Sequence, residues 1–286
     1  MTTRTKGVLV FILISFGLAW AGMFIARLVF DLSLVNPLVQ LAGIAFTPAI
    51  AAIVVRKWVT REGFADAGMR PRIRRNIGLY LAAWLGPLGF AAATLAVAAA
   101  VGEWEFDLSA FALLPGQPVW VSIAVLQLVV IVLAPIYWGE EFGWTSYLRL
   151  RLFPERPFLS TLLTGFIWAV WHYPLAFLGY IEFANVAFGL VVWTVMFMLQ
   201  EVILTWLRMR SGSVWTASLA HAGNNMIFAM LVGEAMADNT PDMQTLVAVA
   251  PSAALAAWIV FSGRLAADRP EPVAVPESRP VAAAHG

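Results

Sequence analysis

Eight apolar stretches separated by short charged loops constrain this chain most, because each approaches the ~20 residues that a helix needs to cross ~30 Å of hydrocarbon. The chain is 61% hydrophobic and 12% charged, whereas soluble domains are usually ~45–50% apolar and ~25% charged. Lipid offers the backbone no hydrogen-bond partners, so such stretches must be helical. The sequence therefore predicts an all-α, polytopic membrane protein with about eight transmembrane helices. They are expected at residues 7–30, 37–55, 77–101, 118–139, 158–179, 184–207, 214–233 and 243–262.

Charge in the loops predicts the orientation of these helices. Apart from Arg27, every Lys and Arg lies before the first stretch, after the last one, or in the second, fourth or sixth loop. The first, third, fifth and seventh loops carry the acidic residues Asp31, Glu103, Glu105, Asp107, Glu182, Glu234, Asp238 and Asp242. Basic loops mark the cytoplasmic side of a membrane. We therefore expect a multi-pass protein of the cell membrane with both termini in the cytoplasm.

The chain is expected to form one transmembrane domain over residues 1–265, followed by a short tail. Residues 266–286 are rich in Pro, Ala, Glu and Arg and show no periodicity. Such a composition cannot bury an apolar core, so it predicts a disordered cytoplasmic tail. The chain has no cysteine, which excludes disulfides, thiol nucleophiles and cysteine-ligated metals.

Ionisable residues at the end of one stretch and inside two others indicate a functional site. Glu140 and Glu141 end the fourth stretch, and the fifth and seventh stretches each carry one histidine, His172 and His221. A charged side chain at the bilayer centre costs at least ~2.5–3.5 kcal/mol, and residues of this kind usually mark functional sites. Their presence on three separate stretches predicts that they meet inside the membrane.

The spacing around each histidine supports this interpretation. Trp168 and His172 are four residues apart, as are His221 and Asn225, so each pair lies on one face of its helix. Glu140 lies near the cytoplasmic end of its stretch. We therefore expect an active site between helices in the cytoplasmic half of the membrane, open toward the cytoplasm.

Two chemistries fit these side chains. A carboxylate and an imidazole can take a proton from water, and a second imidazole with an amide can donate hydrogen bonds to a developing oxyanion. Together these groups would suffice to hydrolyse a peptide bond. The same atoms could instead bind a divalent metal such as Zn²⁺, with Glu140, His172 and His221 as candidate ligands and a bound water made more acidic. The spacing leaves both open.

The three segments that surround Glu140 and Glu141, His172, and His221 resemble the motifs of the CPBP intramembrane proteases. This is the family of the type II CAAX prenyl endopeptidases and of Abi-like bacteriocin-processing and immunity proteins. The matching positions lie within residues 139–226 and are Glu140, Glu141, Gly143, Trp144, Tyr147 and Leu148, then Trp168 and His172, then His221 and Asn225. Trp168 stands where Phe is more usual. Thr145 and Ser146 depart from the pattern, which usually has Arg and Gly at these positions.

The resemblance implies an intramembrane endopeptidase of a family often described as metalloproteases. It implies that Glu140 and His172 activate the water, that His221 and Asn225 stabilise the oxyanion, and that Glu141 supports the site. It also implies a substrate that is a membrane-anchored protein or peptide, which can be lipidated. Membrane lipid is the other expected partner, and no nucleic acid is expected.

Two other functions remain open. The departure at Thr145 keeps open a non-catalytic immunity or binding protein on the same scaffold. Buried acids and histidines also serve transporters and proton relays, although the sequence shows neither the inverted repeats nor the paired broken helices typical of transporters. Glu201 in the sixth stretch is assigned no catalytic role, and either a structural contact or a place in the same cavity would explain it.

Overall fold

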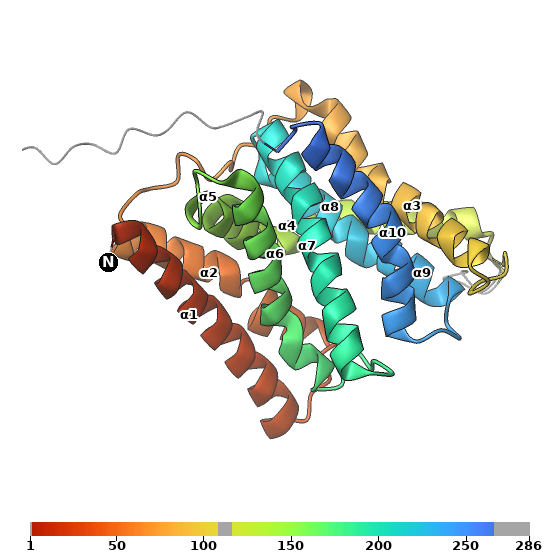
Figure 1. Ribbon diagram of the computed structural model, residues 1–286. Helices are drawn as coiled ribbons and strands as arrows, with labels where there is room; N and C mark the ends of the chain where they lie inside the picture. The colour runs from red at the N-terminus through yellow and green to blue at the C-terminus, as the bar shows by residue number, and fades with distance from the viewer. Residues whose placement is uncertain (1, 108–115, 266–286) are drawn as a thin grey trace, which may run out of the picture.

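The computed structural model describes residues 2–107 and 116–265. Within these residues the secondary structure is helical and contains no strand, which confirms the predicted all-α class. Figure 1 shows the helices packed side by side in one bundle, with α1 at one edge. The predicted tail, residues 266–286, lies outside the described residues.

The α-helices are α1 (Thr3–Phe24), α2 (Thr47–Val54), α3 (Ile77–Ala100), α4 (Val119–Gly143), α5 (Arg149–Arg151), α6 (Pro157–His172), α7 (Val186–Ser211), α8 (Val214–Gly223), α9 (Ala229–Ala235) and α10 (Pro241–Phe261). Several are extended by π-helical segments, which are η1 (Ile25–Val29), η2 (Val39–Ala45), η3 (Val55–Val59), η6 (Trp144–Leu148) and η8 (Asn224–Phe228). Two short 3-10 helices are η4 (Ile73–Arg75) and η7 (Tyr173–Ala176).

Six helical segments of the described chain are long and apolar enough to cross a membrane, so this is an integral membrane protein. They are Thr3–Val29, Val39–Val59, Ile77–Ala100, Val119–Arg151, Val186–Ser211 and Pro241–Phe261. Each corresponds to one of the predicted stretches. The predicted stretches at 158–179 and 214–233 do not reach the same length and hydropathy, so the count of about eight is not confirmed.

The two shorter or more polar segments are the ones that carry the histidines. Helix α6 has 16 residues. It ends at His172 because Pro174 lacks the N–H that would continue the α-helix, and the chain passes into η7. Helix α8 and η8 contain His221, Asn224 and Asn225, whose polar side chains lower the mean hydropathy. The proline and the polar residues near the candidate site thus make these two segments shorter or less hydrophobic than the other membrane spans.

The loops gather at two opposite ends of the bundle according to their charge. At one end, Arg151 Nε donates to Glu62 Oε1 at 2.8 Å. At the other, Asn239 Nδ2 donates to Glu103 Oε2 at 2.8 Å. We call these ends the basic face (residues 57–76, 149–156 and 208–213) and the acidic face (residues 30–38, 101–107, 177–185 and 233–242).

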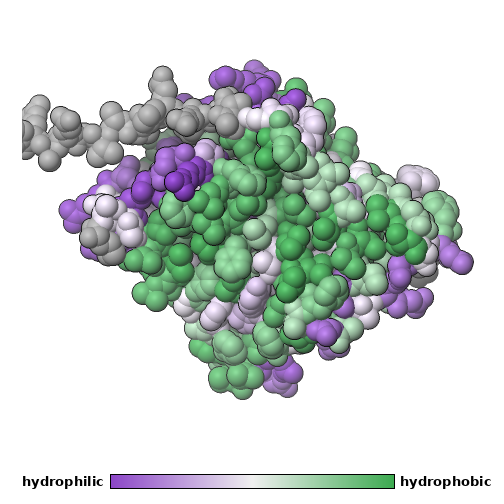
Figure 2. All heavy atoms as spheres, in the orientation of Figure 1, coloured by the Kyte–Doolittle hydropathy of each residue, from purple (hydrophilic) through white to green (hydrophobic). Residues whose placement is uncertain are grey.

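Apolar side chains cover the sides of the bundle between these two faces. Figure 2 shows hydrophobic residues spread over the helices, with hydrophilic ones gathered toward the margins of the view. Leu13 and Val132 are each 73% exposed, and Trp120 is 70% exposed. Large apolar patches are rare on soluble monomers and are typical of surfaces that contact a partner or lipid, in agreement with a bundle embedded in a bilayer.

Close approach between backbones brings the end of α4 into the interior. A Cβ built on Gly139 would lie 2.4 Å from the backbone oxygen of Ala45 in η2. In the same way, a Cβ on Gly165 of α6 would lie 2.7 Å from Met198 Cα in α7. Small residues at such positions allow membrane helices to pack closely. Gly139 directly precedes Glu140, and Gly165 lies three residues before Trp168, so packing positions adjoin the motif residues.

We expect the substitution Gly139→Ala to destabilise the fold by about 1–3 kcal/mol, because overpacking forces backbone shifts. Gly89→Ala in α3 is the matched control, since a Cβ there meets nothing within 4 Å. Thermal unfolding in detergent micelles would compare the two. Equal melting temperatures for both variants would contradict the close approach of α4 and η2.

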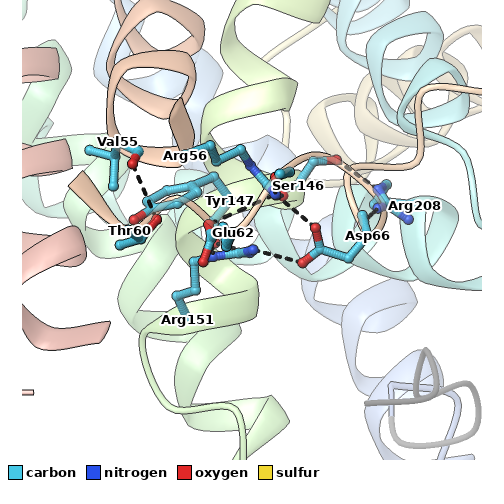
Figure 3. A network of polar contacts seen from close by, with 10 residues as sticks. Val55, Arg56, Thr60, Glu62, Asp66, Ser146, Tyr147, Arg151 and Arg208 are labelled. Atoms are coloured by element: carbon cyan, nitrogen blue, oxygen red, sulfur yellow. Dashed lines mark hydrogen bonds and ion pairs between the residues drawn. The ribbon is translucent and has the colours of Figure 1, made fainter. Parts of the chain in front are cut away.

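The loop between η3 and α3, residues 60–76, lies across the basic face, and we call it the strap. Figure 3 shows Asp66 of the strap held between arginines. Arg56 Nη1 donates to Asp66 Oδ1 and Arg151 Nη2 donates to Asp66 Oδ2, each at 2.7 Å. Arg208 Nη2 donates to the backbone oxygen of Asp66 at 2.6 Å. The strap is thereby tied to η3, α5 and α7.

The same arginines hold the turn that follows the two motif glutamates. Arg56 Nη2 donates to the backbone oxygen of Ser146, and Arg208 Nε donates to Ser146 Oγ, both at 2.7 Å. The side chains of Arg56 and Arg208 are almost fully buried, where bonds from a charged donor are stronger than neutral ones. Ser146, which departs from the family pattern, therefore supplies an acceptor that glycine would lack.

Asp66 makes the stability of this network depend on pH. Burial by itself would raise the pKa of Asp66, but Arg151 and Arg56 outweigh burial and hold the pKa below its ordinary value. Because the folded-state pKa is depressed, the stabilisation is fully present above the unfolded pKa of about 3.9. It is lost as the pH falls through the folded-state pKa.

We therefore expect Asp66→Asn to be less stable than the wild type near neutral pH, and the gap to close as the solution is acidified below about pH 4. Melting temperatures in detergent across a pH series would measure this. Glu155→Gln is the control, because Glu155 makes an exposed ion pair with Arg4 and such pairs contribute little. A gap of constant size at every pH would argue against the ionic role of Asp66.

Candidate active site

The two motif glutamates occupy the last turn of α4 and face different surroundings. They are consecutive, so their side chains leave the helix ~100° apart. Glu140 lines a cavity and is 7% exposed, whereas Glu141 does not line it and is fully buried. The π-helical segment η6 begins directly after this turn, and π-helical segments are frequent at functional sites.

Glu141 and His221 form a buried contact between α4 and α8. His221 Nδ1 and Glu141 Oε1 are 2.9 Å apart. When the Nδ1–H group donates a hydrogen bond to the carboxylate, the orientation of the ring is fixed and Nε2 is the nitrogen left for a ligand.

Trp168 connects Glu140 with both histidines. Its Nε1 donates to Glu140 Oε2 at 2.8 Å, and its backbone oxygen lies 3.0 Å from His172 Nδ1. Its ring packs edge-on against the His221 ring, with centroids 5.1 Å apart. Phenylalanine, the more usual family residue, could pack in the same way but could not donate to Glu140.

His172 lies at the end of α6, with Nδ1 occupied by the turn of its own helix. Its ring stacks on Phe197 of α7, with centroids 4.5 Å apart. With Nδ1 donating to the Trp168 carbonyl, Nε2 carries the free lone pair of a neutral imidazole. The side chain is therefore oriented by two neighbouring helices, α6 and α7.

A cavity of about 660 Å³ brings the predicted residues together, since Glu140, His172, His221 and Asn225 all line it. Asn225 Nδ2 donates to the backbone oxygen of His221 at 3.2 Å, which leaves a second amide hydrogen for a ligand. Most of the remaining walls are apolar and include Leu133, Ile136, Met196, Phe197, Phe228 and Val232.

Two other polar residues, Asn224 and Glu201, differ in whether they line the cavity. Asn224 lines the cavity beside Asn225. Glu201 does not line it. Its carboxylate is fully buried and accepts a hydrogen bond from Thr205 Oγ1 at 2.8 Å, and it interacts electrostatically with Glu141 and Arg149.

Thr145, the other departure from the family pattern, is satisfied within its own helix. Its hydroxyl donates to the backbone oxygen of Glu141 at 2.8 Å, and the side chain is fully buried. Thr145 thus makes no hydrogen bond to either motif carboxylate.

The described residues contain no group of three His, Asp or Glu side chains placed to hold a metal ion. Glu140, His172 and His221 share one cavity, and their contacts with Trp168 and Glu141 engage one nitrogen of each histidine and one oxygen of Glu140. In this arrangement the three side chains are not gathered into a set of metal ligands, and no step below depends on a metal.

The sequence analysis missed two aromatic residues that shape the site. Tyr137 lines the cavity, and its ring lies 4.7 Å from that of His221. Its position three residues before Glu140, on the same helical face, is a signal that could have revealed it. Phe197 under His172 has no such local signal, because it depends on how α6 meets α7.

We expect Glu141→Ala to lower the free energy of unfolding by about 1–3 kcal/mol, because it leaves the buried His221 Nδ1 without its acceptor. Glu141→Gln keeps an oxygen at this position and should cost less. Unfolding in detergent would rank the two variants. If glutamine were as damaging as alanine, the hydrogen bond could not be the reason.

Comparison with known proteins finds a match that covers the region of the three motifs. A family model described as type II CAAX prenyl endopeptidase Rce1-like matches residues 120–227. The matched region contains every motif position from Glu140 to Asn225. No curated protein matches the chain. The match confirms, over this region of the chain, the resemblance carried by the three motifs.

Proposed function

We propose that the protein is an intramembrane endopeptidase that hydrolyses a peptide bond of a membrane-associated or lipidated protein or peptide. The observation that carries this proposal is that Glu140, His172, His221 and Asn225 line one cavity. Glu140 and both histidines each have one polar atom fixed by Trp168 or Glu141. Their other polar atoms are therefore preoriented for a ligand, as catalysis requires.

Water activation falls to Glu140 and His172. Glu140 Oε2 is held by Trp168, so Oε1 is free to accept a proton from a water in the cavity. His172 Nε2 can accept a hydrogen bond from the same water or take its second proton. A base placed in this way contributes typically ~10²–10⁴-fold to a rate. The attacking oxygen then adds to the carbonyl carbon of the scissile peptide.

The oxyanion formed by this attack needs donors. His221 Nε2, when protonated, and the second Nδ2 hydrogen of Asn225 can supply them from the same wall, since the two residues are four apart on α8 and η8. Such donors, fixed in place among largely apolar walls, stabilise developing charge strongly. The proton held on Glu140 can then pass to the leaving amine, which completes hydrolysis with one water consumed.

The orientation of the protein is part of the proposal. Basic loops mark the cytoplasmic side, and in the structure these loops lie together at the basic face. We place the basic face and both termini in the cytoplasm of a cell whose plasma membrane the bundle spans. The apolar walls of the cavity suit a substrate that is itself partly embedded in lipid.

The test is cleavage of a fluorogenic peptide, farnesylated and unmodified, by the purified protein in lipid nanodiscs. We expect Glu140→Gln to lower kcat/KM by about 10²–10⁴-fold, because it removes the base while keeping the shape of the side chain. Glu155→Gln, which changes an exposed carboxylate, should cleave at the wild-type rate. Normal cleavage by Glu140→Gln, in protein that melts like the wild type, would refute the proposal.

A further inference from the structure

The cavity extends from the reactive groups in one direction only. On α4 it is lined from Glu140 back to Leu133, and on α7 from Gln200 back to Trp193. Both helices begin at the acidic face, so their cavity-lining residues run from the level of the glutamate toward that face. On α10, the lining residues are those of the first two turns after the acidic face.

The lining also reaches exposed chain at the acidic face. Val35 and Pro37, in the loop after α1, line the cavity, and Val35 is 61% exposed. Tyr180 and Ile181, in the loop before α7, line it as well. The cavity is therefore bordered by surface loops on this side.

The opposite end of the cavity is closed. Of the described residues of the basic face, none lines the cavity. Between that face and Glu140 lie the fully buried Glu141, Thr145 and Ser146. Outside them lies the strap. Arg56 and Arg208 each bond both to Asp66 of the strap and to Ser146 beneath it. Opening a path through this layer would break several buried charge-assisted hydrogen bonds.

Taken with the proposed peptidase function, on which this inference rests, these contacts indicate the side of the membrane from which the substrate enters the cavity. We propose that the catalytic cavity admits its substrate from the acidic face, so the protein cleaves peptide segments that lie on the side of the membrane away from its arginine network. With the basic face in the cytoplasm, as in the proposed orientation, these substrates are external or exported segments. This differs from the cytoplasmic opening that the sequence led us to expect.

The absence of cysteine from the chain makes this direct to test with single-cysteine variants. Gln200→Cys and Thr245→Cys place a thiol on the cavity wall, the first on α7 and the second near the start of α10. Asp238→Cys and Arg210→Cys place reference thiols on the acidic and basic faces, where both residues are exposed. The probe is a sulfonated, membrane-impermeant maleimide added to sealed right-side-out or inverted membrane vesicles.

We expect Gln200→Cys and Thr245→Cys to be labelled in the vesicle orientation that labels Asp238→Cys, and not in the one that labels Arg210→Cys. Labelling together with Arg210→Cys would overturn the proposal. So would protection of both cavity thiols from either side, when they react fully after denaturation in SDS, because the cavity would then lack an aqueous mouth.

The labelling result does not depend on proteolysis. Repeating it in the Glu140→Gln background should leave the pattern unchanged, because that substitution removes the base and not the mouth of the cavity. A protein that labels as expected but cleaves no peptide would contradict the proposed function alone. A protein that cleaves but labels from the basic face would contradict this inference alone.

Discussion

The buried contact between Glu141 and His221 is the interaction on which the site depends. It joins α4 and α8 across 80 residues of sequence and satisfies two polar groups that would otherwise be costly in a membrane interior. Helix α8 has only 10 residues and is not among the spans, and most of its residues are buried. The other helices therefore shield it from lipid, and through Glu141 it fixes the place of Glu140.

Features that depend on local pattern were predictable from the sequence. The helical class and six spans follow from runs of apolar residues, and the four-residue spacing of Trp168 and His172 matches the hydrogen bond found within that turn. Features that depend on how helices meet were not predictable. The bond from Trp168 Nε1 to Glu140 and the stacking of His172 on Phe197 each require two helices to approach in one particular register.

The departures from the family pattern illustrate the same limit. From the sequence, Thr145 and Ser146 read as the loss of an arginine and a glycine. In the structure, Thr145 donates to a backbone carbonyl, and Ser146 accepts from Arg208, a residue 62 positions further along the chain. The end of α4 is fastened by cations from other helices. A motif compared position by position cannot reveal such distant partners.

The strap has a mechanical consequence. At the basic face, hydrogen bonds from three arginines tie η3, α5 and α7 to one loop, and bonds from a charged donor are stronger than neutral ones. Between the acidic loops, the described contacts are fewer and mostly single hydrogen bonds, such as those of Asn239 and Asp242. The helices are therefore held together more firmly at the basic face than at the acidic face. We expect them to separate more easily at the acidic face, so the width of the cavity should respond to the thickness and lateral pressure of the surrounding lipid.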